Sequence, residues 1–449
     1  MRDIKFALPP AVQKILSTLH TAGFDGYIVG GAVRDVLLDK PVKDWDFTTN
    51  ATPEQIQKLF PDSFYDNQFG TVGIAGKHLN DKENPEAVYE ITTYRSEGLY
   101  TDHRRPDSVT WGKTVEEDLQ RRDFTINAMA LGENKIIDPY HGQDDIKNHV
   151  IRAVGDPSMR FQEDALRMMR AVRIGAQLGF AVEQLTIAAI TQNAHLLEHI
   201  SWERIRDEFL KILVSDYPEE GIQLLASTNL LKHILPELLE CRGVQQAHHH
   251  IYDVWTHTLK AVNTCPSKDP IVRLAVLLHD IAKPLTADTS SGTVTFYNHE
   301  VLGARVARKV AERFRLSKKD IQRVFMLVRW HMFVYDPKVT DAYIRRFIRR
   351  VGVEYISDMI ALRVADRVGS GATATSWRLE EMQKRIEGQL QKTFSMNDMA
   401  IDGNDLMKEF GLRPGPEVGK LLKMLFKDVV EHPEHNTKEY LMEKAKKLL

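Results

Sequence analysis

The sequence predicts an α+β protein whose first third mixes strands with helices and whose remainder is almost entirely helical. Residues 1–150 alternate short β-rich runs with helical segments. Beyond Asp156, amphipathic stretches such as Gln162–Leu178 and Trp202–Leu213 dominate, with few β-branched runs between them. A single core rarely supports a chain of 449 residues, so we expect two to four domains.

The strand-bearing region contains elements in a definite order. Runs of β-branched and aromatic residues predict strands, and glycine pairs predict turns. The expected elements are strands at Tyr27–Val29, Trp45–Thr49, Glu90–Tyr94 and Val109–Trp111, with a turn at Gly30-Gly31 before a helix at Ala32–Leu38. Polar breaks near Cys241–His250 and Gly369–Ser376 interrupt the helical remainder. We therefore expect domains at residues 1–150, 151–244, 245–375 and 376–449.

The composition is that of an ordinary folded protein. Apolar residues make up 43% of the chain and charged residues 27%, and the net charge is −2. Any surface that binds a phosphate backbone must therefore be a local cluster of Lys and Arg. Cys241 and Cys265 form no ligand spacing, which favours a reducing compartment. No apolar run has the length of a signal-peptide core or a membrane span, so we expect a cytoplasmic location.

The first candidate site begins, along the chain, with a pair of glycines. Gly30 and Gly31 follow an apolar strand and begin a helix. Glycines there allow close backbone approach, and the free amides of a helix start can bind phosphate. Arg34, just inside the helix, can add a forked cation for a triphosphate. Taken alone, this pattern is more often a plain turn.

Two aspartates strengthen the hypothesis. If Asp44 and Asp46 lie in one strand, they project to the same face while Trp45 points away. Carboxylates held this close repel each other unless a cation bridges them, and Mg²⁺ prefers such oxygen ligands. Two-metal phosphoryl transfer requires this arrangement. Glu90 is a candidate third carboxylate. A solvated acidic turn, and a structural ion pair for Glu90, remain the alternatives.

The ordered motifs GGAVRD (Gly30–Asp35) and DWD (Asp44–Asp46) resemble the polymerase-β-like nucleotidyltransferases. The resemblance is to the bacterial-type (class II) tRNA nucleotidyltransferases and the related poly(A) polymerases. It implies a catalytic domain with a mixed sheet in residues 1–150, which uses Mg²⁺ and adds C, C and A to the tRNA 3′ end from CTP and ATP. A poly(A) polymerase and an enzyme that adds only CC or only A are alternatives within the family.

Two further stretches fit the same resemblance. Arg122 and Asp123, in RRDFTINAMA, match the motif that joins sugar recognition to the catalytic domain. Asp123 would contact the ribose, although a buried pair with an arginine is equally consistent. The polar stretch SEGLYTDHRRPDS (residues 96–108) resembles the flexible loop that enzymes adding only CC lack. Its presence favours complete CCA addition.

The stretch EDALRMMRAVR carries the most specific hypothesis. Asp164, Arg167, Arg170 and Arg173 are spaced by three residues, so on one helix they form a polar stripe. The segment resembles the family's amino-acid template, in which an Asp and an Arg read the incoming base. Ionised Asp only accepts and Arg only donates, which suits the amino group and ring nitrogen of C and A but not U and G. Arg170 and Arg173 would serve the triphosphate and the framework. The alternative is a solvated charged face.

A separate set of His and Asp residues lies in the helical region. The pattern H…HD…D resembles the HD superfamily of metal-dependent phosphohydrolases, and it comprises His257, His279, Asp280 and Asp366. Imidazole and carboxylate ligands suit Mn²⁺, Fe²⁺, Co²⁺ or Ni²⁺. His299 and His331 are candidates for a second metal. In relatives this domain removes 2′-phosphates or 2′,3′-cyclic phosphates; the alternative is that it mainly holds tRNA.

Four arginines recur at near-helical spacing: Arg345, Arg346, Arg349 and Arg350. They predict an RNA-backbone patch, although exposed arginine pairs are common. With these motifs, tRNA, CTP and ATP are the expected partners, and no membrane is expected. Beyond the alternatives within the family, a protein that is mainly an HD phosphohydrolase or a non-catalytic RNA-binding protein remains open. The sequence does not indicate an oligomeric state.

Overall fold

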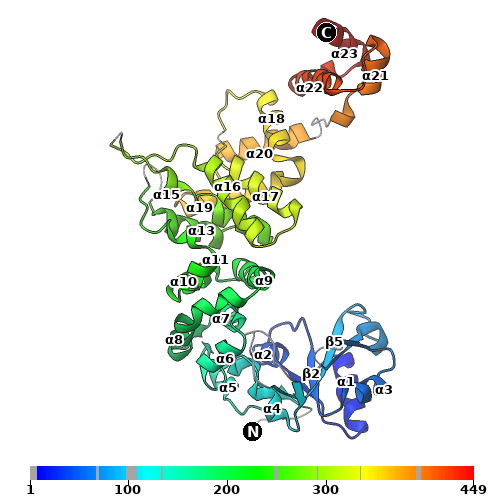
Figure 1. The fold of residues 1–449 in the computed structure, drawn as a ribbon, viewed down its shortest axis with the longest axis vertical. Coiled ribbons are helices and arrows are strands. Elements are labelled where there is room, and N and C mark those ends of the chain that lie inside the picture. Colours follow the sequence, from blue (N-terminus) through cyan, green and yellow to red (C-terminus); the bar gives the residue numbers. More distant parts are fainter. Residues whose placement is uncertain are drawn as a thin grey trace. The chain divides into compact units, whose positions relative to one another are not determined.

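The computed structural model describes residues 8–66, 70–97, 109–132, 135–246, 251–290, 292–333, 335–390 and 396–449. It divides into two compact units, Met1–Leu239 and Glu240–Leu449 (Figure 1). The predicted flexible loop at residues 96–108 lies almost wholly outside the described residues, as do His248–His250. No helix in the described ranges has the length and apolar character needed to cross a membrane.

The first unit is built on a mixed sheet of seven strands, as predicted. The strand order is β3-β4-β5-β2-β1-β8-β9. Its strands are β1 (Tyr27–Val29), β2 (Asp46–Thr49), β3 (Phe64–Asp66), β4 (Thr71–Ala75), β5 (Val88–Thr93), β8 (Ala130–Leu131) and β9 (Ile136–Ile137). Strands β2 and β5 run parallel, whereas every other neighbouring pair is antiparallel. Two small ribbons pair β6 (Arg95–Glu97) with β7 (Val109–Trp111) and β10 (Val150–Ile151) with β11 (Ala181–Val182).

The prediction that Asp44 shares a strand with Asp46 is wrong. Strand β2 starts at Asp46, which pairs with Val29, the last residue of β1. The chain then turns away at Gly30, whose φ is +73°, a conformation that favours glycine. Asp44 therefore has no partner on β1 and lies in the loop before the strand.

Helices surround the sheet and then continue without it to residue 239. They are α1 (Pro10–Thr21), α2 (Gly31–Leu37), α3 (Pro53–Leu59), α4 (Val115–Gln120), α5 (Gly142–Lys147), α6 (Pro157–Glu163), α7 (Leu166–Leu178), α8 (Gln184–Asn193), α9 (Trp202–Leu213), α10 (Pro218–Ser227), α11 (Leu230–Ile234) and α12 (Pro236–Leu239). Helix α9 has the predicted bounds, and the prediction that the chain beyond residue 156 is almost entirely helical is confirmed; among the described residues the short strand β11 interrupts it.

The continuous helix predicted over Gln162–Leu178 is wrong. The chain leaves the helical conformation at Asp164, with φ −138° and ψ 104°, so α6 ends at Glu163. The Asp164 carboxylate accepts a hydrogen bond from the Leu166 N–H at 3.0 Å. Aspartate side chains readily compete with the helical pattern in this way. Asp164 therefore lies between two helices rather than on the stripe formed by α7.

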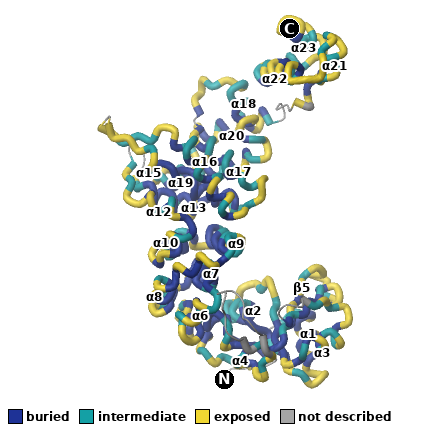
Figure 2. The backbone as a smooth tube through the Cα atoms, in the orientation of Figure 1, coloured by how far each residue is buried: buried dark blue, intermediate teal, exposed yellow. Residues whose placement is uncertain are grey.

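The second unit is helical throughout its regular elements. They are α13 (Val254–Asn263), α14 (Pro270–Leu278), α15 (Lys283–Thr286), α16 (His299–Arg313), α17 (Lys318–Trp330), α18 (Asp341–Val351), α19 (Ile356–Gly369), α20 (Trp377–Leu390), α21 (Gly403–Phe410), α22 (Pro416–Glu431) and α23 (Lys438–Leu448). Apolar residues occupy nearly every position of α14, and from Ile271 to Leu278 all are buried. A helix that is apolar on all sides must lie inside. Figure 2 shows buried residues gathered around α13, α16 and α19.

The last three helices have a small core of their own, and a buried arginine links it to α18. Arg345 Nε and Nη2 donate to the carbonyls of Val430 and Glu431, each at 2.6 Å. These carbonyls end α22 and have no helical partner. The predicted RNA patch is therefore wrong for Arg345. Its three companions also contact protein groups, namely the Glu431 carboxylate for Arg346, the Phe426 ring for Arg349 and the Trp330 ring for Arg350.

Candidate functional sites

Two neighbouring parallel strands of the first unit carry carboxylates in register. The register pairs Asp46, the first residue of β2, with Glu90 on β5. Side chains in register on parallel strands project to the same face. Burial raises the pKa of Asp46; the Arg122 charge opposes this rise, and the charge of Asp44 adds to it. Asp44 thus acts on Asp46 although it precedes the strand. An oxygen-only group with mutual repulsion suits a cation such as Mg²⁺.

The start of helix α2 lies against this group. A Cβ on Gly30 would come 3.1 Å from Arg122 Nη1 and 3.6 Å from Asp46 Oδ2. A Cβ on Gly31 would come 3.3 Å from Arg34 Nη2, so the Arg34 guanidinium lies back over the first turn of its helix. A side chain at either position would crowd these groups, so the glycines allow the backbone to lie close to both guanidinium groups, which a bound phosphate could also contact.

A chain of polar contacts joins Arg34 to helix α7. Arg34 Nη1 donates to Asn127 Oδ1 at 2.9 Å, and Asn127 Nδ2 donates to Asp123 Oδ1 at 3.2 Å. The other oxygen of Asp123 accepts from Arg170 Nε at 2.7 Å. Of the two interpretations of Asp123, the structure shows the buried pair with an arginine. Burial alone would raise the pKa of Asp123, but Arg170 and Asn127 outweigh it and lower the pKa to about 2.

Asp164 and Arg167 do not contact each other through their side chains. Asp164 Oδ2 accepts from Arg204 Nη2 at 2.7 Å. Arg167 donates to Glu163 Oε2 at 2.6 Å and to the Arg121 carbonyl at 3.0 Å. Arg173, further along α7, forms an ion pair of 2.6 Å with Glu208. Arg167 and Arg173 do not form a solvated charged face, because only 12% and 16% of their side chains are exposed, whereas 37% of the Arg170 side chain is exposed.

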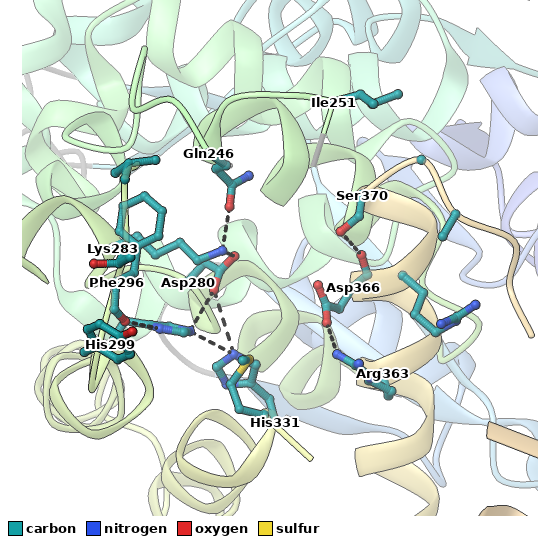
Figure 3. Close-up of a pocket in the computed structure, with 17 residues that line it drawn as sticks. Gln246, Ile251, Asp280, Lys283, Phe296, His299, His331, Arg363, Asp366 and Ser370 are labelled. Carbon is teal, nitrogen blue, oxygen red and sulfur yellow. Dashed lines mark hydrogen bonds and ion pairs between the residues drawn. The ribbon is translucent and has the colours of Figure 1, made fainter. Parts of the chain in front are cut away.

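Six side chains from five helical regions converge in the second unit, and Figure 3 labels four of them: Asp280, His299, His331 and Asp366. They are His257 on α13, His279 and Asp280 after α14, His299 at the start of α16, His331 after α17, and Asp366 on α19, and all are buried. The two oxygens of Asp280 face different partners. Oδ2 lies 3.3 Å from His257 Nε2 and 3.2 Å from His279 Nε2. Oδ1 lies 3.4 Å from His299 Nε2 and 3.8 Å from His331 Nε2.

Backbone carbonyls fix the orientation of three of these imidazoles. Nδ1 of His279, His299 and His331 lies 2.7, 2.8 and 2.7 Å from the carbonyl three residues earlier. A proton on Nδ1 leaves Nε2 as the lone-pair atom, and Nε2 is the atom that faces the cluster. Outer hydrogen bonds of this kind are typical of histidine metal ligands. Burial lowers the pKa of His279, but Asp280 and Asp366 outweigh it and raise the pKa to about 10. A metal would have to displace this proton.

A cavity of about 760 Å³ opens beside the six residues. Lys283, Arg363 and Arg367 line it, together with Phe296 and the exposed Tyr297. Lys283 Nζ lies 2.6 Å from Asp280 Oδ2, and Arg363 Nη1 lies 2.6 Å from Asp366 Oδ2 (Figure 3). The cations and the ring-lined wall suit an anionic ligand with an apolar part.

Comparison with known proteins identifies the family. Residues 26–152 match the Poly A polymerase head domain family, and residues 294–445 match the tRNA nucleotidyltransferase domain 2 family. Residues 179–241 match a family described as "Probable RNA and SrmB-binding site of polymerase A". A CCA-adding enzyme of Ligilactobacillus salivarius is 35% identical over 100% of this chain and 97% of its own length.

The chain belongs to the CCA-adding enzymes. A relative with that name from Lactobacillus helveticus is 36% identical over 94% of this chain and 93% of its own length. The structure of a Bacillus stearothermophilus CCA-adding enzyme in complex with CTP is 29% identical, with a TM-score of 0.73 over 98% of this chain and 99% of that one. A Thermotoga maritima CCA-adding enzyme complexed with tRNA shares the fold, with a TM-score of 0.56 at 20% identity over 98% of this chain and 95% of that one.

Several side chains in the first unit were not predicted from the sequence motifs. Arg204 and Glu208 lie one turn apart on α9 and pair with Asp164 and Arg173. Asp118 is fully buried between Arg121 and Arg122. A charged pair four residues apart within the amphipathic stretch WERIRDEF was the available signal for α9. No local pattern indicates Asp118.

Buried guanidinium nitrogens without a hydrogen-bond partner occur in this region of the enzyme. Among the described residues they include Arg122 Nε, Arg160 Nε and Arg204 Nη1. A buried donor without an acceptor costs about 1–3 kcal/mol, so it calls for an explanation. A bound anionic ligand is an explanation that fits, because it would supply acceptors beside these positively charged side chains.

The low pKa of Asp123 makes part of this unit's stability dependent on pH. A carboxyl group with a lowered folded-state pKa stabilises the fold above its unfolded pKa, and this stability is lost as the pH falls through the folded value. The shift of the pKa from 3.8 to about 2 corresponds to about 2 kcal/mol of folding stability at neutral pH.

We expect Asp123→Asn to lower the free energy of urea unfolding by at least about this amount at pH 7, with the deficit shrinking between pH 4 and 2. The exposed Asp144→Asn is the control. A deficit independent of pH would contradict the assignment.

Proposed function

We propose that this protein adds C, C and A to the 3′ end of tRNA from CTP and ATP without a nucleic-acid template. The observation that carries the proposal is the pairing of Asp46 with Glu90 beside the helix start at Gly30 and Arg122. The family relationship over nearly the whole chain supports it.

In the proposed reaction the tRNA 3′-hydroxyl attacks the α-phosphate of CTP or ATP, and pyrophosphate leaves. Asp44 and Asp46 would hold Mg²⁺, with Glu90 as the third carboxylate. The ion would supply Lewis-acid activation of the hydroxyl and positive charge beside the triphosphate. The amide of Gly31 and the guanidinium groups of Arg34 and Arg122 bind phosphate oxygens, and the polar chain through Asn127 keeps Arg34 in place.

Base choice is assigned to Asp164 and Arg167. The carboxylate accepts from the amino group of C or A, and the guanidinium donates to the adjacent ring nitrogen. In the structure both side chains have protein partners, so the incoming base must share or replace those hydrogen bonds. Arg170 and Arg173 hold the framework through Asp123 and Glu208.

Incubation with tRNA that lacks its CCA end, followed by sequencing of the product ends, tests the activity. With CTP and ATP together we expect termini that end in CCA, and with CTP alone termini that stop after CC. A poly(A) tail with ATP alone would assign the protein to the poly(A) polymerases. Products that stop at CC with both nucleotides present, or addition of A only to tRNA ending in CC, would indicate a partial enzyme. No incorporation would refute the proposal.

A second activity is supported by the cluster around Asp280. We propose that His257, His279, Asp280 and Asp366 hold one divalent transition metal, such as Mn²⁺, Co²⁺, Ni²⁺ or Fe²⁺, and that His299 and His331 share Asp280 with a second. Metal ions held by these residues would supply Lewis-acid activation of a phosphate ester. The cavity beside the cluster would take RNA ends with 2′-phosphate or 2′,3′-cyclic phosphate. A domain that only holds tRNA is the competing interpretation.

The division into four functional parts also remains a proposal. Residues 1–150 would carry nucleotidyl transfer, 151–244 nucleotide recognition and RNA binding, 245–375 the HD site, and 376–449 a helical tail. A cytoplasmic location is proposed as well, and it is supported by the two cysteines, Cys241 and Cys265, which are both free and buried.

A further inference from the structure

The side chain that holds the proposed base-reading carboxylate comes from α9, outside the motif that contains Asp164. Arg204 Nη2 lies 2.7 Å from Asp164 Oδ2, and the Leu166 N–H lies 3.0 Å from Oδ1. Each oxygen thus has a donor in a fixed position. Arg167 contributes to neither, since it donates to Glu163 and to two main-chain carbonyls. The direction in which Asp164 presents its lone pairs is therefore set by Arg204 and the backbone.

We propose that Arg204 is a positioning residue that sets base selectivity through Asp164. This inference rests on the proposed function, because it assumes that Asp164 reads the base. Arg204 itself need not touch the nucleotide. Its planar fork fixes the carboxylate direction in a way that a flexible ammonium group does not.

Two observations distinguish this role from a simple tie between helices. The first is that α9 is already joined to α7 one turn further on, where Glu208 pairs with Arg173. The second is that the carboxylate partner of Arg204 belongs to Asp164, which has left the helical conformation at the end of α6 with φ −138° and ψ 104°. The contact therefore holds a side chain that lies between α6 and α7, whereas the contact of Glu208 with Arg173 holds one helix against another.

The chemistry explains how a residue behind Asp164 can control the choice of base. Cytosine and adenine offer an amino donor to the carboxylate, whereas uracil and guanine place a carbonyl oxygen at that position. Two facing acceptors repel, but only if the carboxylate cannot turn aside. Without Arg204, Asp164 Oδ2 is free to rotate away from an incoming carbonyl. UTP and GTP would then be admitted more readily, while CTP and ATP would lose part of their hydrogen bond.

The test compares Arg204→Ala and Arg204→Lys with Arg206→Ala, a change at an arginine of similar exposure on the same helix that pairs with its neighbour Asp207 instead of Asp164. For each protein, kcat and KM are measured for all four nucleotides on tRNA lacking CCA. We expect Arg204→Ala to raise the use of UTP relative to CTP by about tenfold or more, as for a lost base contact. Arg204→Lys should fall between Arg204→Ala and wild type, and Arg206→Ala should behave as wild type.

A double-mutant cycle shows whether Arg204 acts through Asp164. We expect Asp164→Ala combined with Arg204→Ala to be no less selective than Asp164→Ala alone. Unchanged selectivity in Arg204→Ala, an equal loss for all four nucleotides, or full additivity in the cycle would each overturn the inference. If Arg204→Ala does not fold, Arg204→Lys carries the same test. Failure of the proposed function is separately visible, because wild type would then not prefer CTP and ATP.

Discussion

Replacing Asp46 with asparagine is expected to lower nucleotide incorporation by about a thousandfold or more, and Asp44→Asn should do the same. A neutral amide cannot hold Mg²⁺ comparably, and the several kcal/mol that the ion supplies in phosphoryl transfer correspond to a loss of this size. Asp46 has a raised pKa because of burial and the Asp44 charge, so neutralising either one relieves repulsion in the folded protein. The thermal midpoint Tm should therefore be equal to or above that of wild type.

The measurement is single-turnover incorporation of labelled CTP at saturating Mg²⁺, with tRNA binding measured in parallel. Asp62→Asn, a change at an exposed carboxylate of the same unit, is the matched control and should keep wild-type rates. Near-normal incorporation by Asp44→Asn or Asp46→Asn would refute the carboxylate assignment. A loss of tRNA binding equal to the loss of rate would show that these residues act in binding rather than in transfer.

Asp280→Asn is expected to remove metal-dependent release of phosphate completely while leaving CCA addition within about twofold of wild type. One carboxylate faces both pairs of histidines, so its loss removes a ligand from both proposed metals at once. The two activities use ligands in different units, and changes at separate sites are usually independent. The assay follows phosphate release from 2′-phosphate nucleotides, and opening of the ring to a monophosphate for 2′,3′-cyclic phosphate nucleotides, with Mn²⁺, Co²⁺ or Ni²⁺.

Metal content separates a two-metal site from a one-metal site. Wild type should bind two ions per chain, whereas His257→Ala and His331→Ala should each retain one, because they belong to opposite sides of Asp280. Asp288→Asn, at an exposed position in the same unit, is the control. One ion in wild type would refute the second metal. Bound metal without any turnover would favour the domain as a holder of tRNA.

The sequence predicted those helices and strands well whose residue pattern lies within the segment itself. Tyr27–Val29 and Trp202–Leu213 form the expected strand and helix, because β-branched runs and 3.6-residue periodicity are properties of the segments themselves. The break at Asp164 was missed because one aspartate side chain overrides an otherwise continuous periodicity.

The arrangement of the candidate sites could be predicted only in part. The pairing of Asp46 with Glu90 depends on the register of strands that are distant in the chain, which no local pattern contains. The partners Arg204 and Asp118 are likewise supplied by tertiary packing. In the second unit the motif named the His and Asp residues, but not that the two oxygens of Asp280 face opposite pairs of histidines.

The contact between Arg345 and the end of α22 has a consequence for how the chain can change over evolutionary time. Its acceptors are the main-chain carbonyls of Val430 and Glu431, which every amino acid possesses. Residues in the last turn of α22 can therefore be replaced without removing the attachment. Arg345 cannot be replaced without losing these hydrogen bonds, because no other side chain has the same planar arrangement of N–H donors. Substitutions should therefore be tolerated in the last turn of α22 and be selected against at Arg345.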